Sequence, residues 1–122
     1  MRASIKHMDL KAEFSTPENC FIIELANSAD DPEISIVRAR VVPGATTRWH
    51  RLRDTAERYV IIGGRGVVEV GELPPAAVGP GDVVVIPPLC RQRITNTGNR
   101  DLIFLAICTP RFSEAVYEDL ET

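Results

Sequence analysis

Several features that define other classes of protein are missing from this chain of 122 residues. No apolar run approaches the roughly 20 residues that a membrane-spanning helix needs, so we expect no contact with a membrane. The charged segment 1–7 is not followed by the apolar core of a signal peptide. The three cysteines form no CxxC pair, which disfavours both a disulfide framework and a zinc ribbon. These absences predict a cytoplasmic protein with reduced thiols.

The chain also lacks an excess of positive charge. Its formal net charge is -3, which disfavours binding to nucleic acid, and we expect none. The cations are unevenly divided into 12 Arg and 2 Lys. Because Arg binds carboxylate and phosphate groups through paired donors, small anions are candidate ligands. With 44% hydrophobic and 25% charged residues, the composition is that of one ordinary globular domain, long enough to bury a core.

Proline and glycine divide the chain into short runs that are rich in β-branched residues. Runs of this length between turns are typical of strands, whereas no long segment repeats with the period of a helix. The expected strands cover residues 21–25, 34–42, 59–62, 67–70, 83–86, 91–95 and 102–108. Seven short strands predict an all-β sandwich or barrel.

The two ends of the chain are expected to differ from this pattern. Residues 1–20 are interpreted as an extended arm, which in β-rich proteins often pairs with an edge strand and sometimes with one of a neighbouring subunit. This interpretation predicts a homodimer. Near the other end, a short C-terminal helix is predicted, with Ser113 as its cap and with Phe112 packed on Tyr117 as a hydrophobic staple.

Two gapped patterns lie within residues 43–96. The first contains Gly44, His50, Leu52, Glu57 and Gly64, and the second contains Gly81, Pro87, Leu89, Gln92 and Asn96. Their order and spacing resemble the two signature motifs of the cupin superfamily, a Gly followed by His-x-His, Glu and Gly, and a Gly followed by Pro-x-Gly, His and Asn. The resemblance implies a double-stranded β-helix, or jelly-roll, barrel and a single cupin-like domain over residues 1–122. The glycines of both patterns are expected at turns that need a positive φ angle.

The same resemblance implies a divalent metal ion inside the barrel. In metal-binding cupins the motif histidines and the glutamate are the ligands, which here correspond to His50, Glu57 and Gln92. Leu52 replaces the second histidine, and the amide of Gln92 is a weaker ligand than the imidazole that it replaces. Three ligands leave an open coordination position, which is typical of a catalytic site. One ion of Mn, Fe, Ni or Zn is therefore the expected cofactor, and no nucleotide cofactor is predicted.

The alternation of side chains along a strand predicts which residues surround the three expected ligands in a pocket. Residues two apart share a face of a strand, so inward-pointing ligands bring their neighbours with them. The expected pocket residues are Arg48, Leu52, Tyr59, Cys90, Gln92 and Ile94. A mostly apolar cavity with a few convergent polar groups is typical of a small-molecule site.

Four of these residues have more than one interpretation. His50 is either a metal ligand or general base, or it is hydrogen-bonded to Glu57 in a metal-free barrel. Gln92 is a weak ligand, a hydrogen-bonding partner of the substrate, or a residue that fills the barrel. Cys90 is either a reactive thiol or an apolar filler. Arg48 either clamps an anionic substrate or forms a surface ion pair.

Three further residues are assigned away from the site or to its margin. Glu18 and Asp119 are expected in solvated loops or ends. His7 either completes the site of a partner subunit or is a solvated residue of the arm.

Two classes of function remain. One is a metal-dependent oxidoreductase, dioxygenase or isomerase that acts on a small anionic organic molecule, with His50 and Glu57 as candidate catalytic residues. The other is a metal-free ligand-binding or sensor module that uses the same cavity without turnover. The fold alone does not separate these classes.

Overall fold

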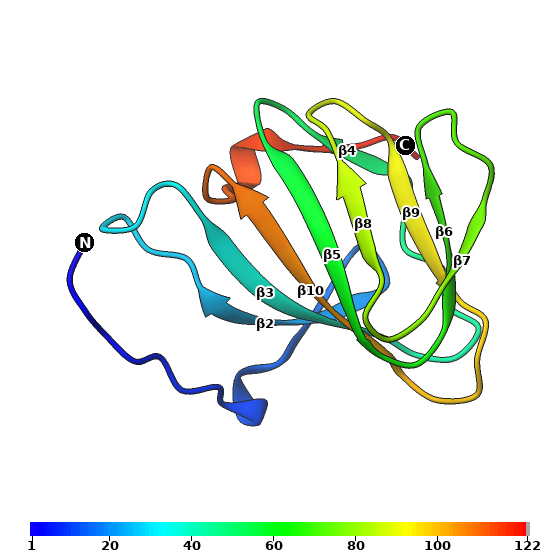
Figure 1. The fold of residues 1–122 in the computed structure, drawn as a ribbon, viewed down its shortest axis with the longest axis horizontal. Coiled ribbons are helices and arrows are strands. Elements are labelled where there is room, and N and C mark those ends of the chain that lie inside the picture. The colour runs from blue at the N-terminus through cyan, green and yellow to red at the C-terminus, as the bar shows by residue number, and fades with distance from the viewer. Residues whose placement is uncertain (122) are drawn as a thin grey trace.

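The computed structural model describes residues 1–121 and consists almost entirely of antiparallel strands (Figure 1). The larger sheet has the order β1-β2-β3-β10-β5-β8, and the smaller one has the order β11-β4-β9-β6-β7. The strands are β1 (Phe14–Thr16), β2 (Cys20–Ala26), β3 (Ser35–Val41), β4 (His50–Leu52), β5 (Ala56–Gly63), β6 (Gly66–Val70), β7 (Ala76–Val78), β8 (Val83–Ile86), β9 (Gln92–Asn96), β10 (Leu102–Thr109) and β11 (Tyr117–Asp119). The two sheets form the double-stranded β-helix that the motifs predict.

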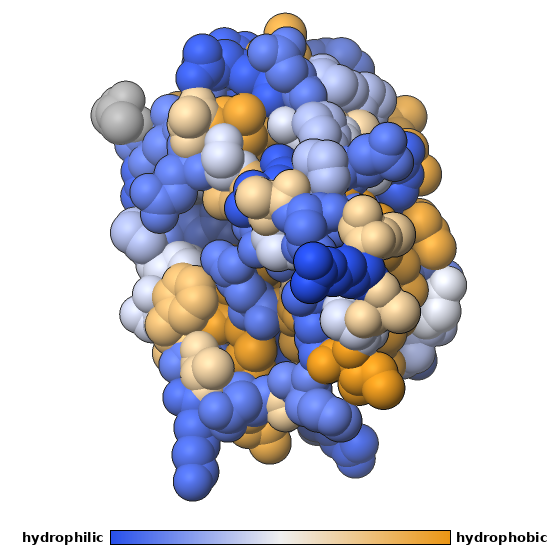
Figure 2. Space-filling model, turned by 90° about the vertical axis from the view of Figure 1, so that its left-hand side faces the viewer, coloured by the Kyte–Doolittle hydropathy of each residue, from blue (hydrophilic) through white to orange (hydrophobic). Residues whose placement is uncertain are grey.

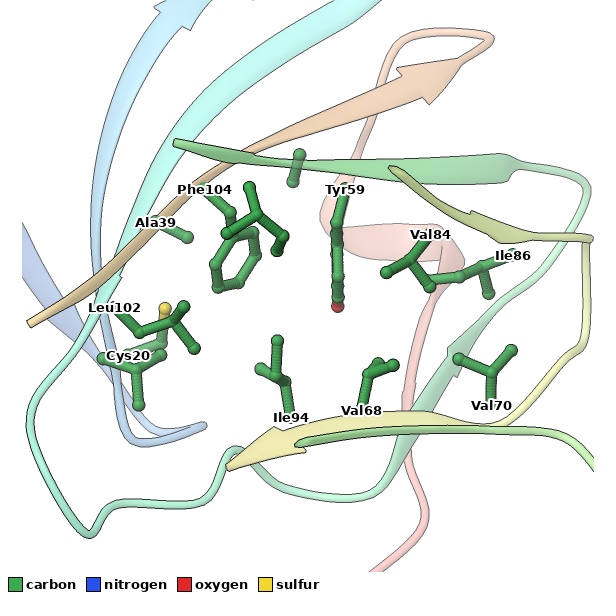
Figure 3. Close-up of a cluster of buried hydrophobic side chains, with 13 residues drawn as sticks. Cys20, Ala39, Tyr59, Val68, Val70, Val84, Ile86, Ile94, Leu102 and Phe104 are labelled. Carbon is green, nitrogen blue, oxygen red and sulfur yellow. The ribbon is translucent and has the colours of Figure 1, made fainter. Parts of the chain in front are cut away.

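Side chains that alternate along the strands fill the space between the sheets. In β10 every second residue is buried, beginning with Leu102, and β9 and β6 show the same alternation. In Figure 3, Tyr59 and Phe104 of the larger sheet point toward Ile94 and Val68 of the smaller one. The rings of Tyr59 and Phe104 lie 4.5 Å apart between their centroids. This core closes part of the barrel and leaves the rest for a cavity.

The turns agree with the expectation for the motif glycines. Gly44, Gly64 and Gly81 all have φ angles between 82° and 91°. At Gly64 the space is also restricted, because an added Cβ atom would lie 2.5 Å from the carbonyl oxygen of Asp101. A side chain at this position would therefore both strain the backbone and collide with it.

The expected strands are all present, with boundaries that shift by up to three residues. Four strands of three residues each, β1, β4, β7 and β11, are not among the strands expected from the sequence. A strand of three residues is too short to show a clear alternation in sequence, and β7 directly follows two prolines. Of these short strands, β1, β7 and β11 lie at sheet edges, whereas β4 lies between β11 and β9.

The predicted C-terminal helix is wrong. The structure has only a 3-10 helix, η2 (Glu114–Val116), and the side chain of Ser113 makes no capping hydrogen bond. Tyr117 instead begins β11, which pairs with β4. A helix of so few residues is marginal in water, whereas pairing satisfies the backbone groups of an exposed sheet edge.

The N-terminal arm pairs with an edge strand of its own chain. Residues 14–16 form β1 against β2, after a second 3-10 helix, η1 (Leu10–Ala12). The segment before it runs along the outside of the molecule, and His7 is exposed there (Figure 1). None of the helical segments in residues 1–121 has the length and apolar character needed to cross a membrane.

Candidate ligand-binding cavity

A cavity of about 620 Å³ lies between the sheets, beside the hydrophobic core. Its wall is formed by the inward faces of β2, β3, β4, β5, β10 and β11 and by residues 14–18 and 112–114. Figure 2 shows the left side of Figure 1, where hydrophobic surface is visible between hydrophilic side chains. The volume suits a small organic ligand, because such sites usually measure about 300–1,000 Å³.

His50 is the central polar residue of this wall. It lies on β4 opposite Gln92 of β9 and Asp119 of β11, and only 4% of its surface is exposed. Its Nδ1 atom is 2.7 Å from the carbonyl oxygen of Arg48. A carbonyl can only accept a hydrogen bond, so Nδ1 carries the proton of the neutral ring. The Nε2 atom is then an unprotonated acceptor.

His50 lines the cavity, and its Nε2 atom is in contact with accessible space. This atom makes no hydrogen bond to the residues that the structure describes. No fully buried side-chain nitrogen or oxygen in residues 1–121 lacks a partner, so this atom is not sealed inside the protein. The imidazole ring stacks on Tyr117, with 5.2 Å between the centroids and 21° between the planes. Stacking and the Nδ1 hydrogen bond together hold the ring in one orientation.

Glu57 of β5 also lines the cavity, and it is held by neutral donors. Gln92 donates from Nε2 to Glu57 Oε1 at 2.8 Å, and the Cys108 thiol is 3.7 Å from Glu57 Oε2. Tyr59 in turn donates its hydroxyl hydrogen to the amide oxygen of Gln92. Burial raises the pKa of Glu57, and the nearby His50 and the hydrogen bond from Gln92 partly oppose this rise.

Glu18 and Tyr117 belong to the site although the sequence places them elsewhere. Glu18 lines the cavity, and its Oε2 atom is 3.9 Å from His50 Nδ1. Burial and the neighbouring carboxylate of Glu18 raise the pKa of Tyr117. Asp119 also lines the cavity. Glu18 and Asp119 are thus partly exposed, as expected, but they also form part of the cavity wall. No motif marks these residues. They lie near the two ends of the chain, and the short strands β1 and β11 bring these ends to the site.

Arg48 occupies the rim, as parity predicts. Its Nε atom donates to Asp119 Oδ2 at 3.0 Å, and its Nη2 atom donates to the carbonyl oxygen of Glu121 at 3.0 Å. These contacts correspond to the ion-pair interpretation of Arg48. They also fasten the C-terminal segment over the edge of the smaller sheet.

The other expected pocket residues divide into two groups. Leu52 and Tyr59 line the cavity. Gln92 and Ile94 are 1% and 0% exposed and lie within the packed interior, outside the set of lining residues. Cys90 is half-buried in the turn before β9, where it packs against Gly71. Alternation correctly predicts which β9 side chains point inward, but it does not distinguish the filled part of the barrel from the hollow part.

The arrangement of Gln92 does not fit the metal set that the resemblance implies. The only atom with which Gln92 could bind a metal is its amide oxygen, and this atom accepts a hydrogen bond from Tyr59. Its amide nitrogen donates to Glu57, a second expected ligand. Residues 1–121 contain no group of three or more His, Cys, Asp and Glu side chains placed to hold a metal ion. Of the three expected ligands, only His50 has a ligand atom, Nε2, that makes no hydrogen bond within residues 1–121.

Comparison with known proteins identifies the family and the fold. Residues 37–108 match the family model described as "Cupin domain". An uncharacterized protein of Methanocaldococcus jannaschii is 33% identical over 87 residues, which cover 71% of this chain and 69% of that protein.

Two other similarities are narrower in scope. A glucose-6-phosphate isomerase of Thermococcus kodakarensis is 43% identical over 63 residues, which cover 48% of this chain. This match spans only 33% of the isomerase. The structure of Pac13 from Streptomyces, a nucleoside dehydratase, superposes with a TM-score of 0.77 and 15% identity over 96% of this chain and 92% of that one. At this identity the likeness concerns the fold alone.

Proposed function

Because the chain belongs to the cupin family, we propose that it binds a small organic molecule in the cavity between its sheets and that His50 transfers a proton to and from this molecule. One observation carries the proposal. The hydrogen bond from His50 Nδ1 to the Arg48 carbonyl leaves Nε2 as a base that faces the cavity. A general base must lie within hydrogen-bonding reach of the proton that it removes, and Nε2 meets this condition for a ligand in the cavity.

The surroundings of His50 support this role. When Nε2 takes up a proton, the ring becomes positively charged, and the carboxylate of Glu18 at 3.9 Å from Nδ1 stabilises that charge. The stacked ring of Tyr117 limits the rotation of the imidazole. A base with a fixed orientation loses less entropy when it reacts.

Proton transfer also agrees with the chemistry named for two similar proteins. One is an isomerase of glucose 6-phosphate, and the other is a nucleoside dehydratase whose structure was determined with uridine. The first match covers only a third of the isomerase, and the second is a likeness of fold. We therefore use them only to choose the molecules of the first assay.

The metal-dependent alternative requires a different arrangement of Gln92. A divalent ion held by His50, Glu57 and Gln92 would polarise a ligand carbonyl or activate water. Such an ion would have to displace Tyr59 from the Gln92 oxygen and separate the Gln92 amide from Glu57. The donor set therefore supports proton transfer by His50 more directly than metal ligation.

The second candidate function is ligand binding without turnover. It is favoured by the hydrogen bonds that hold Glu57 inside the wall, because Gln92 and Cys108 occupy both of its oxygens. In that case the cavity recognises a ligand and His50 only accepts a hydrogen bond from it.

Deuterium incorporation tests the proposal. The protein is incubated in D₂O with glucose 6-phosphate, with uridine and with a panel of uncharged sugars and amines, and exchange is followed by mass spectrometry. We expect incorporation into at least one compound that also binds the protein, and we expect this incorporation to be lost in His50→Asn. A compound that occupies the cavity but exchanges no hydrogen would favour the binding module. Exchange that is unchanged in His50→Asn would contradict the role of His50.

A further inference from the structure

The charges on the cavity wall indicate which class of ligand it accepts. We propose that the ligand is a small organic ammonium ion with an apolar or aromatic body, and not the anion that the arginine-rich composition suggests. This inference rests on the proposed function, because it concerns the same cavity. It adds the charge and shape of the molecule that His50 meets.

Carboxylates outnumber cations around the cavity. Five acidic side chains line it, namely Glu18, Glu24, Glu57, Glu114 and Asp119. Arg48 is the only Arg or Lys among the lining residues. Its guanidinium is already shared between Asp119 and the carbonyl oxygen of Glu121. An anionic ligand would therefore meet uncompensated negative charge, whereas a cation would relieve it.

Two of these carboxylates are free to meet a ligand. Glu24 and Glu114 are exposed and lie at the open part of the wall. Within residues 1–121, neither has an Arg, Lys or His nitrogen within ion-pair distance. Glu57, by contrast, is buried and bonded. Negative charge is thus available at the entrance, where it attracts cations from solution.

Aromatic rings provide the second, independent observation. Five of them line the cavity: Phe14, Tyr59, Phe104, Phe112 and Tyr117. The faces of aromatic rings attract organic cations, and protein sites for ammonium groups commonly combine rings with carboxylates. The remaining wall includes apolar side chains such as Ile22 and Leu52, which suit the body of a ligand rather than a second charge.

His50 is compatible with an ammonium ligand. Its Nε2 atom is an acceptor in the neutral ring, as argued above, so an N–H group of the ligand can donate to it. A carboxylate has no hydrogen to donate to this atom. The polar centre of the cavity and its charged rim therefore select the same chemistry.

Three probes with one ring and different charge test this inference: benzylammonium, benzyl alcohol and benzoate. Their affinities are measured at constant ionic strength by titration of the amide resonances of ¹⁵N-labelled protein. We expect benzylammonium to bind at least about 10-fold more tightly than benzoate, with benzyl alcohol between them. The double variant Glu24→Gln/Glu114→Gln should weaken binding of benzylammonium several-fold and leave benzyl alcohol unchanged. Glu72→Gln, which removes an exposed charge outside the cavity wall, should change neither.

The outcomes separate this inference from the function on which it rests. Binding of benzoate as tightly as benzylammonium overturns the inference and leaves the cavity and His50 as proposed. An equal effect of Glu72→Gln and of the double variant also overturns it, because the preference would then reflect only net charge. If none of the three probes perturbs resonances of lining residues, both the inference and the proposed cavity function are contradicted.

Discussion

Gln92 donates a hydrogen bond of 2.8 Å from its amide nitrogen to the carboxylate of Glu57, and the two side chains come from opposite sheets of the barrel. In the metal-binding relatives that the motifs resemble, the corresponding positions both bind the ion. Here they bind each other. Tyr59 completes the chain by donating to the amide oxygen of Gln92. This contact makes Gln92 part of the protein interior, whereas His50 and Glu57 both line the cavity.

The first prediction concerns the stability that this contact provides. Gln92→Leu should lower the free energy of unfolding by about 1–3 kcal/mol, because it removes the partner of Glu57 Oε1 and of the buried Tyr59 hydroxyl. Gln92→Leu combined with Glu57→Leu should cost less than the sum of the two single changes, since both polar groups are then removed. Urea denaturation of the four proteins measures the coupling. Strictly additive effects would mean that Gln92 and Glu57 do not interact in solution.

A second prediction concerns metal binding. Protein purified without a chelator or a histidine tag should contain no stoichiometric Mn, Fe, Ni or Zn, because the Gln92 amide is engaged by Tyr59 and Glu57. Leu52→His combined with Gln92→His restores the family pattern and should bind Ni²⁺ or Zn²⁺ more tightly than the unmodified protein.

Elemental analysis and calorimetric titration measure this difference. The control is the same double variant with His50→Ala, which should lose the gain in affinity. Stoichiometric metal in the unmodified protein that disappears in His50→Ala would support the metal-dependent class instead.

A third prediction concerns assembly, because the outer face of strands β5, β8 and β10 in the larger sheet is largely apolar. Ile62, Val83 and Val85 are 53%, 58% and 62% exposed on this face, and β10 continues it with Leu105 and Ile107. Soluble monomers rarely expose contiguous apolar surface. Arg58 is the only charged residue on the outward side of β5, β8 and β10, so most of this surface can be buried between two copies without desolvating a charge.

We therefore predict a homodimer through this face. Light scattering coupled to size-exclusion chromatography should give twice the chain mass for the protein and the monomer mass for Val85→Lys. Leu73→Lys, which changes an exposed apolar residue of a turn elsewhere, should remain a dimer. A monomeric unmodified protein would show that the face has another role.

A fourth prediction concerns pH and the N-terminal arm. Glu13 receives hydrogen bonds from Arg40 Nε at 2.9 Å and Nη2 at 2.6 Å, which join the arm to β3. The hydrogen bonds and the positive charge of Arg40 lower the pKa of Glu13 below its usual value. Because the folded-state pKa is depressed, this contact stabilises the protein above the usual glutamate pKa. The contribution is lost as the pH falls through the folded-state value.

Glu13→Gln should therefore lower the free energy of unfolding at neutral pH by up to about 1 kcal/mol, and the difference should vanish in acid. Denaturation series at several pH values measure this dependence. Glu33→Gln serves as the control, because Glu33 is exposed and forms no ion pair within residues 1–121. An effect of Glu13→Gln that does not change with pH would contradict the ion-pair explanation.

The sequence predicts the barrel well because buried and more exposed side chains alternate regularly along its strands. In β10 and β9 every second residue is buried, and the motif spacing correctly orders the turns around Gly44, Gly64 and Gly81. Periodicity of this kind is a local property, so it can be interpreted without knowledge of the tertiary structure. The prediction of a C-terminal helix is wrong because it uses local sequence alone. The local preference for a helix is weak, and the pairing of β11 with β4 outweighs it.

The site is predicted only in part. The motifs identify His50 and Glu57, but Glu18 and Tyr117 come from the chain ends and are brought to the cavity by strands of three residues. Nothing in the local sequence marks them as site residues. The direction of the Gln92 amide is equally inaccessible, because it depends on which neighbours, here Tyr59 and Glu57, lie on either side of it.

The protonation state of His50 tests the central claim most directly. The chain has 2 histidines, so the ring nitrogens of ¹⁵N-labelled protein can be assigned without ambiguity by comparison with His50→Asn. At alkaline pH, long-range ¹H–¹⁵N correlation spectra should show His50 with its hydrogen on Nδ1 and with a bare Nε2 whose signal shifts when benzylammonium is added. A hydrogen on Nε2, or an Nε2 signal that is unaffected by a ligand bound in the cavity, would contradict the assignment of His50 as the base.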